Sequence, residues 1–265
     1  MSLQFNRFLL FGDSITEFCF DQRPYLRLRP NASENTEALH FSLGAALAND
    51  YSRKLDILRR GFAGYSTRQA RLILPLIFQN DHDNLPETQK IKIMTIFFGT
   101  NDCVNGGPQR VPLDEFADNL KFMIEESLKR NIKLIIVGPS YHDPTKWEPD
   151  RMDQVAMGWI RTTENTVRYT KELKKLSAEY NLPFLDLHLL FEDYSIKNKI
   201  DAESLLVDGV HYTGDGYKIF YDALIKAIDE NYPELSSQNL ERRLPYWRDI
   251  DDKVFAQKLQ NELKK

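Results

Sequence analysis

The sequence predicts an α/β protein with three layers, in which a five-stranded parallel sheet lies between helices. Short apolar runs alternate along the chain with longer segments in which apolar residues recur at helical spacing. Polar motifs follow several of the apolar runs directly. Strands that alternate with helices favour right-handed crossovers and a parallel sheet, and such sheets bind ligands where their strands end.

The strands are expected in apolar runs that are rich in β-branched or aromatic residues. The strongest run precedes Gly99, and the first run is bounded sharply by Gly12. A third run is stopped by Gly138 and the proline that follows it. In chain order, the expected strands are residues 8–11, 55–58, 91–98, 133–137 and 184–187.

The helices are expected between these runs and after the last of them. Phe116, Leu120 and Met123 form an apolar stripe of helical spacing, which should face the core. Residues 21–37 and 141–149 contain prolines and no apolar period, and we expect them to be irregular. In chain order, the expected helices are residues 39–51, 67–78, 113–130, 162–180 and 217–232.

No repeat or linker divides residues 1–234, which we expect to form one domain, with residues 235–265 as a helical extension. In the extension, Phe255, Leu259 and Leu263 form a narrow apolar stripe. Such a stripe cannot stabilise an isolated helix, so the helix should pack against another protein surface. Two interpretations stay open. The helix braces its own domain, or it packs on a second subunit in a homodimer, where Tyr246 and Trp247 close one side of the site.

Composition argues against several classes of protein. A net charge of −4 without a block of lysines and arginines argues against a nucleic-acid partner. No apolar run is long enough for a membrane span. Arg7 interrupts the apolar N-terminal residues, which therefore lack the pattern of a signal peptide. Cys19 and Cys103 make neither a disulfide framework nor a metal finger, so we expect a cytoplasmic protein.

Four polar motifs together predict ester hydrolysis. This reaction needs a nucleophile, a base, a group that orients the base, and donors for the oxyanion. Ser14 can serve as the nucleophile and His211 as the base, with Asp208 three residues before it to orient the ring. Gly64 can offer a backbone N–H and Asn101 a side-chain amide.

Each motif taken alone also has a structural explanation. Ser14 and Glu17 fit a helix capping box, and the other motifs contain ordinary turn residues. We expect Asp13 and Asp102 to accept backbone N–H groups that hold their loops. The four motifs in this order favour catalysis.

GDSIT, GFAGYST, GTND and DGVH match, in order, four sequence blocks of the SGNH (or GDSL) hydrolases, and the sequence resembles this family from about residue 7 to residue 232. The resemblance implies a flavodoxin-like fold and a serine esterase without metal or cofactor. It implies an oxyanion hole formed by Ser14, Gly64 and Asn101. It also implies short-chain acetate esters, such as isoamyl acetate, as substrates. Arg59 stands where many members have asparagine, which leaves open how the Gly64 loop is supported.

Other functions remain as alternatives. Members of the family also hydrolyse acetylated sugars, lysophospholipids and thioesters. Asp13, Asp102 and Asp208 could instead bind magnesium or manganese in a metal-dependent hydrolase. The chain could also be a non-catalytic binding module on a hydrolase scaffold. The phosphate-binding and GxSxG motifs do not occur.

Overall fold

The computed structural model describes residues 4–31 and 37–263, and its centre is a five-stranded sheet with the strand order β2-β1-β3-β4-β5. Every neighbouring pair of strands is parallel, which confirms the expected sheet. The strands are β1 (Asn6–Gly12), β2 (Leu55–Gly61), β3 (Ile91–Phe97), β4 (Lys133–Gly138) and β5 (Phe184–Asp186).

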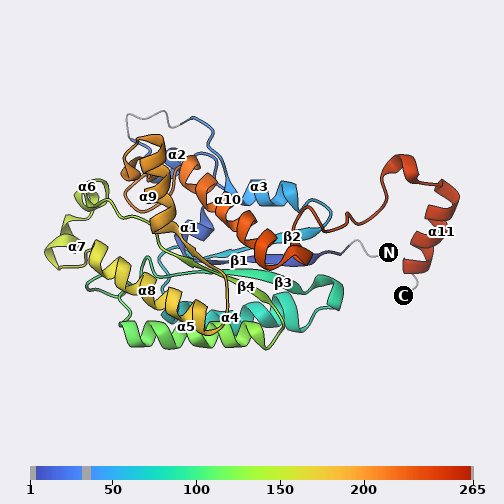
Figure 1. Cartoon of the computed structure of the whole chain (residues 1–265), viewed down its shortest axis with the longest axis horizontal. Coiled ribbons are helices and arrows are strands. Elements are labelled where there is room, and N and C mark those ends of the chain that lie inside the picture. Colours follow the sequence, from blue (N-terminus) through green and yellow to red (C-terminus); the bar gives the residue numbers. More distant parts are fainter. Residues whose placement is uncertain (1–3, 32–36, 264–265) are drawn as a thin grey trace.

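Helices cover both faces of the sheet and complete the three predicted layers (Figure 1). One layer contains α1 (Ser14–Glu17), α3 (Leu43–Asp50), α9 (Leu187–Asn198) and α10 (Gly214–Asn231). The other layer contains α4 (Thr67–Phe78), α5 (Leu113–Leu128) and α8 (Thr163–Glu179).

The central strands are apolar on both faces because both faces are covered. Phe8 and Leu10 of β1 pack in the core beneath α3 and α10, whereas Leu9 and Phe11 pack in the core beneath α4 and α5. All four side chains are at most 2% exposed. Burial on both sides explains why the sequence shows a continuous apolar run rather than alternation.

Several expected boundaries differ from the structure. β2 continues to Gly61, rather than ending at Leu58, because it pairs with β1 as far as Gly12. α3 begins at Leu43, where the Ser42 hydroxyl accepts a hydrogen bond from the Ala45 N–H and caps the helix. α9 was not expected, and β5 stops one residue early because Asp186 caps that helix.

The two segments expected to be irregular contain short helices, α2 (Pro24–Leu28) and α6 (Pro144–Trp147). Each begins with a proline, whose fixed backbone angle and missing N–H suit the first turn of a helix. A third short helix, α7 (Met152–Ala156), follows α6. Residues 32–36, which belong to the first of these segments, lie outside the described residues.

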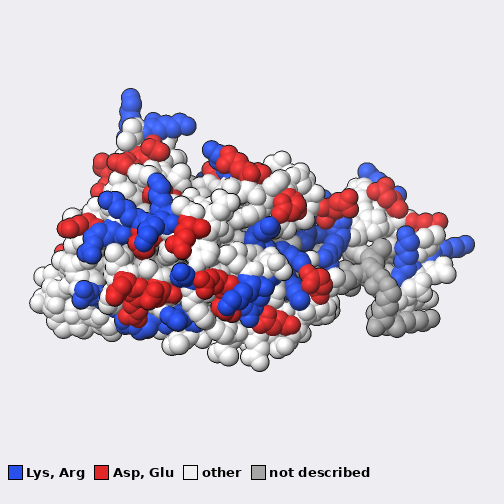
Figure 2. Space-filling model, turned by 60° about the horizontal axis from the view of Figure 1, so that its bottom comes forward, with Lys and Arg blue, Asp and Glu red and all other residues white. Residues whose placement is uncertain are grey.

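The first part of the C-terminal extension packs against the domain, and the last part projects away from it. Leu240 packs against the core, and the Arg53 guanidinium donates hydrogen bonds to the carbonyls of Arg243 and Leu244. The last helix, α11 (Asp252–Leu263), projects from the body of the molecule (Figure 1). In Figure 2 this part stands out as a separate lobe that carries side chains of both charges. Within the described residues, no helix is both long and apolar enough to cross a membrane.

Candidate active site

Ser14 lies at the carboxyl edge of the sheet, on a tight turn between β1 and α1. A Cβ atom at Gly12 would lie 2.7 Å from the Phe97 carbonyl oxygen, so the turn requires glycine there. Asp13, rather than Ser14, caps α1, because its Oδ1 accepts a hydrogen bond of 2.9 Å from the Ile15 N–H. The structural alternative for Ser14, a capping box with Glu17, is therefore not formed, and the Ser14 hydroxyl is available for another partner.

That partner is His211. The Nε2 atom of His211 lies 2.8 Å from the Ser14 Oγ, and its Nδ1 lies 2.8 Å from the Asp208 Oδ2. A carboxylate can only accept, so the ring proton belongs on Nδ1, and Nε2 presents a lone pair to the Ser14 hydroxyl. In this arrangement the imidazole can remove the hydroxyl proton.

The Asp208 carboxylate is held ionised. Burial alone would raise its pKa, but the hydrogen bond from His211, the positive charge that this ring carries when it is protonated, and the backbone N–H groups of His211 and Val210 together lower it. The ionised group can then orient the ring and stabilise its positive charge during the reaction.

The loop that carries Asp208 and His211 is braced by the segment after β4. Gly209 has a φ of +92°, and a Cβ atom there would lie 2.2 Å from the Asp143 carbonyl oxygen. The Gly209 carbonyl accepts a hydrogen bond of 2.9 Å from the Asp143 N–H and lies 3.1 Å from the Nδ1 of His142. Burial, with the nearby charge of Arg161, lowers the pKa of His142 to about 4, so this histidine is neutral at pH 7.

Three neighbouring strands bring the predicted oxyanion donors together. Ser14 follows β1, Gly64 follows β2 and Asn101 follows β3, and the strand order changes direction between these strands. Gly64 has a φ of +79°, and a Cβ atom there would lie 3.5 Å from the Nε2 of Gln109. All five predicted site residues line one cavity of about 270 Å³. Its apolar walls come from residues that were not among the predicted site residues, namely Phe18, Leu28, Ala63, Trp147 and Val210.

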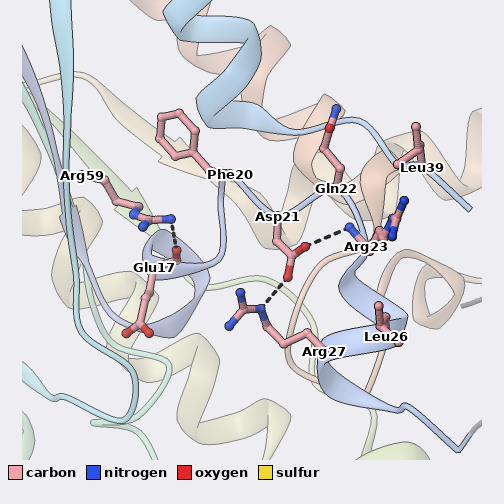
Figure 3. A pocket seen from close by; sticks show the side chains of 9 residues that line it. All are labelled: Glu17, Phe20, Asp21, Gln22, Arg23, Leu26, Arg27, Leu39 and Arg59. Carbon is pink, nitrogen blue, oxygen red and sulfur yellow. Dashed lines mark hydrogen bonds and ion pairs between the residues drawn. The ribbon is translucent and has the colours of Figure 1, made fainter. Parts of the chain in front are cut away.

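A larger hollow of about 760 Å³ lies beside this cavity and shares Arg27 with it (Figure 3). Arg27 forms an ion pair with Asp21 there, and Arg59 donates a hydrogen bond of 2.8 Å to the Glu17 carbonyl. The Glu17 carboxylate in turn accepts from the Ala63 N–H, next to Gly64. Arg59 therefore contacts the end of α1, and Glu17 connects that end to the Gly64 loop.

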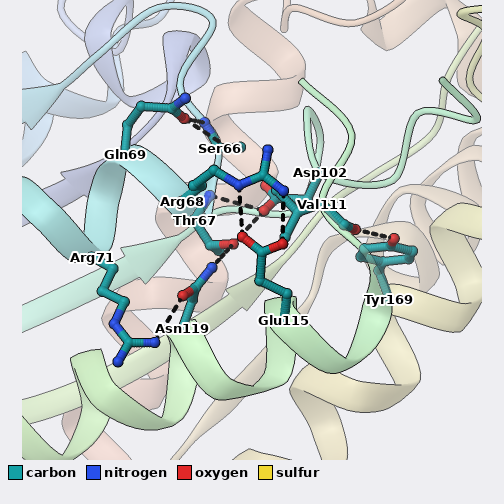
Figure 4. A network of polar contacts seen from close by, with 10 residues as sticks. All are labelled: Ser66, Thr67, Arg68, Gln69, Arg71, Asp102, Val111, Glu115, Asn119 and Tyr169. Carbon is teal, nitrogen blue, oxygen red and sulfur yellow. Dashed lines mark hydrogen bonds and ion pairs between the residues drawn. The ribbon is translucent and has the colours of Figure 1, made fainter. Parts of the chain in front are cut away.

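The buried carboxylates Asp13 and Asp102 hold loops. Asp102 accepts hydrogen bonds from the N–H and hydroxyl of Thr67 at the start of α4, within a polar network that continues to α5 (Figure 4). Burial raises the pKa of Asp13 to about 7 and that of Asp102 to about 6. Across residues 4–31 and 37–263, no three His, Cys, Asp or Glu side chains are grouped to hold a metal ion.

Comparisons with known proteins agree with this geometry. Residues 10–219 match the model of the GDSL-like Lipase/Acylhydrolase family. The chain is 41% identical to the isoamyl acetate-hydrolyzing esterase of Saccharomyces cerevisiae, over 94% of this chain and 97% of that protein. It is 32% identical to the human isoamyl acetate-hydrolyzing esterase 1 homolog, over 94% of this chain and 90% of that protein.

Two solved structures share the fold. A lipase/acylhydrolase from Enterococcus faecalis has a TM-score of 0.60 at 21% identity, covering 91% of this chain and 100% of that one. An acetylxylan esterase from Geobacillus stearothermophilus has a TM-score of 0.56 at 21% identity, covering 86% of this chain and 96% of that one. The resemblance found in the sequence is thus confirmed, and the chain belongs to the GDSL-like lipase/acylhydrolase family of carboxylic ester hydrolases.

Proposed function

We propose that this enzyme hydrolyses short-chain acetate esters of aliphatic alcohols, such as isoamyl acetate. Ser14 is the nucleophile, His211 the general base and Asp208 the group that orients it. The observation that carries the proposal is the hydrogen-bonded series of these three side chains, with both distances at 2.8 Å, on the wall of a small cavity.

The proposed reaction proceeds in two halves. His211 takes the Ser14 proton as Oγ attacks the ester carbonyl carbon, and the resulting imidazolium then protonates the departing alcohol. Water attacks the acyl-enzyme with the same base, which releases acetate and restores Ser14. The backbone N–H groups of Ser14 and Gly64 and the amide of Asn101 stabilise the oxyanion in both halves.

The cavity supports a small and largely apolar substrate. Its volume of about 270 Å³ lies near the lower end of the range for small-molecule sites. Phe18 and Trp147 contribute rings whose centroids lie 5.2 Å and 6.0 Å from that of His211. The names of the Saccharomyces cerevisiae and human relatives point to the same class of ester.

A comparison of kcat/KM across acyl chains and alcohols tests this choice. The kcat/KM for isoamyl acetate should be higher than the kcat/KM for isoamyl octanoate, an acetylated xylose, a lysophospholipid or an acetyl thioester. A preference for one of the other substrates would replace the proposed substrate and leave the esterase chemistry in place.

We further propose that residues 1–234 form the hydrolase domain and that residues 235–265 form an extension that joins two copies in a homodimer. Tyr246 is 52% exposed and Trp247 is 66% exposed, and both precede the projecting helix α11. A charged helix of this length is marginally stable alone, so contact with a second copy would stabilise it.

We also propose a cytoplasmic location. Cys19 and Cys103 are free thiols, which supports a reducing compartment.

A further inference from the structure

Arg161 lies outside the four motifs, yet its guanidinium is buried in the wall of the active-site cavity. The residue is 7% exposed and stands just before α8. Its Nε donates a hydrogen bond of 2.9 Å to the Thr100 carbonyl, and its Nη2 donates one of 3.0 Å to the Asn101 Oδ1. Both acceptors belong to the GTND motif.

These contacts determine which way the Asn101 amide faces. The Oδ1 is directed at the guanidinium, so the Nδ2 must lie on the other side, where it donates a hydrogen bond of 2.9 Å to the Tyr65 carbonyl. An amide nitrogen carries two hydrogens, and the second remains available to the cavity. If the amide turned over, its oxygen would face the reacting carbonyl and repel the developing oxyanion.

Among the residues that the structure describes, no carboxylate forms an ion pair with Arg161, although the charges of Asp13 and Asp208 act on it from a longer distance. The groups that accept its hydrogen bonds are neutral carbonyl oxygens, and the Trp147 ring covers it at 4.8 Å from the ring centroid. Burying a guanidinium this way is costly. A planar fork that bridges Thr100 and Asn101 is a task that arginine performs and lysine does not.

We propose that Arg161 is a positioning residue that sets the orientation of the Asn101 amide for oxyanion binding. The proposal rests on the oxyanion role proposed above for Asn101. In this role Arg161 acts through the Asn101 amide rather than by binding the substrate itself. Its loss should therefore slow the chemical step and leave substrate affinity nearly unchanged.

A double-mutant cycle tests this. Arg161→Met, Asn101→Ala and the double variant are compared with the wild type for kcat and KM on isoamyl acetate. We expect Arg161→Met to lower kcat by about ten- to a hundredfold, less than the ~10²–10³ typical for complete loss of an oxyanion donor. KM should stay within about threefold. Once Asn101 is absent, adding Arg161→Met should change kcat by less than about twofold.

Two further variants keep the test decisive. Arg130 is a partly buried arginine that pairs with Asp83 and Glu126 and does not line the cavity, so Arg130→Met should lower the melting temperature and leave kcat unchanged. If Arg161→Met does not fold, Arg161→Lys replaces it in the cycle. It keeps the charge and loses the fork, and it should show the same dependence on Asn101.

Each contrary result has one meaning. Losses of kcat that multiply in the double variant, or a loss confined to KM, would overturn the positioning role while leaving the proposed function intact. A full-rate Asn101→Ala variant would instead refute the oxyanion role of Asn101 and remove the basis of the inference with it.

Discussion

The substitution Asp208→Asn has a particular consequence here, because the structure dictates which way the new amide faces. The Oδ1 of Asp208 accepts hydrogen bonds from the N–H groups of Val210 and His211, at 3.1 Å and 2.9 Å. An asparagine would place its oxygen at these donors and its NH₂ against the Nδ1 of His211. The ring would then carry its proton on Nε2, facing Ser14, and could not accept the hydroxyl proton.

The size of the effect follows from the alternative orientation. Turning the amide over would leave two buried N–H groups without acceptors, at about 1–3 kcal/mol each. The total cost is therefore about 2–6 kcal/mol. It reduces the fraction of enzyme molecules in which the amide oxygen faces His211, and in which the ring can act as base, by roughly 30-fold to 10⁴-fold. The corresponding substitution in a serine protease lowers kcat by ~10⁴. We therefore expect Asp208→Asn to lower kcat by at least about 30-fold.

The assay is hydrolysis of a chromogenic acetate ester, followed at neutral pH with melting temperatures measured in parallel. Asp186→Asn is the matched control, since Asp186 also caps a chain segment with its carboxylate but lies at the start of α9, outside the cavity. It should retain wild-type kcat. If Asp208→Asn folds and keeps more than about a tenth of the wild-type kcat, the tautomer argument is refuted.

Three further predictions concern the nucleophile, a buried acid and the extension. Ser14→Ala should abolish turnover with little change in melting temperature, and EDTA should not inhibit the wild type; inhibition reversed by Mg²⁺ would favour the carboxylate-metal alternative. Because burial raises the pKa of Asp13 to about 7, this carboxyl group binds more protons in the folded protein than in the unfolded chain between about pH 4 and 7, so its contribution to the free energy of unfolding should fall as pH rises through this window. Asp13→Asn should weaken this dependence in urea titrations at several pH values, and an unchanged slope would contradict the assignment. Removal of residues 246–265 should halve the mass measured by light scattering, whereas an unchanged mass and an unchanged chain-length preference would exclude both the dimer and the pocket role.

The spacing of apolar residues along the sequence was sufficient to predict the three layers of the fold. The apolar runs of β1 and β3 are continuous because helices cover both faces of the sheet, and this pattern by itself predicts buried parallel strands. The helix at 67–78 was also expected, and α4 has these bounds although Pro75 lies inside it. Parallel strands end at one edge, so the motifs that follow them could be expected to meet there.

Tertiary contacts decided what local pattern could not. The Ser14 hydroxyl finds its partner in His211, which lies 197 residues from Ser14 along the chain. Arg161 reaches Asn101 across 60 residues, and no periodicity marks an arginine that will be buried against a carbonyl. The spacing of apolar residues along the sequence indicates which side chains share one face of a helix or strand. A side-chain contact between distant segments exists only after packing has excluded water and has set the direction in which each polar group must face.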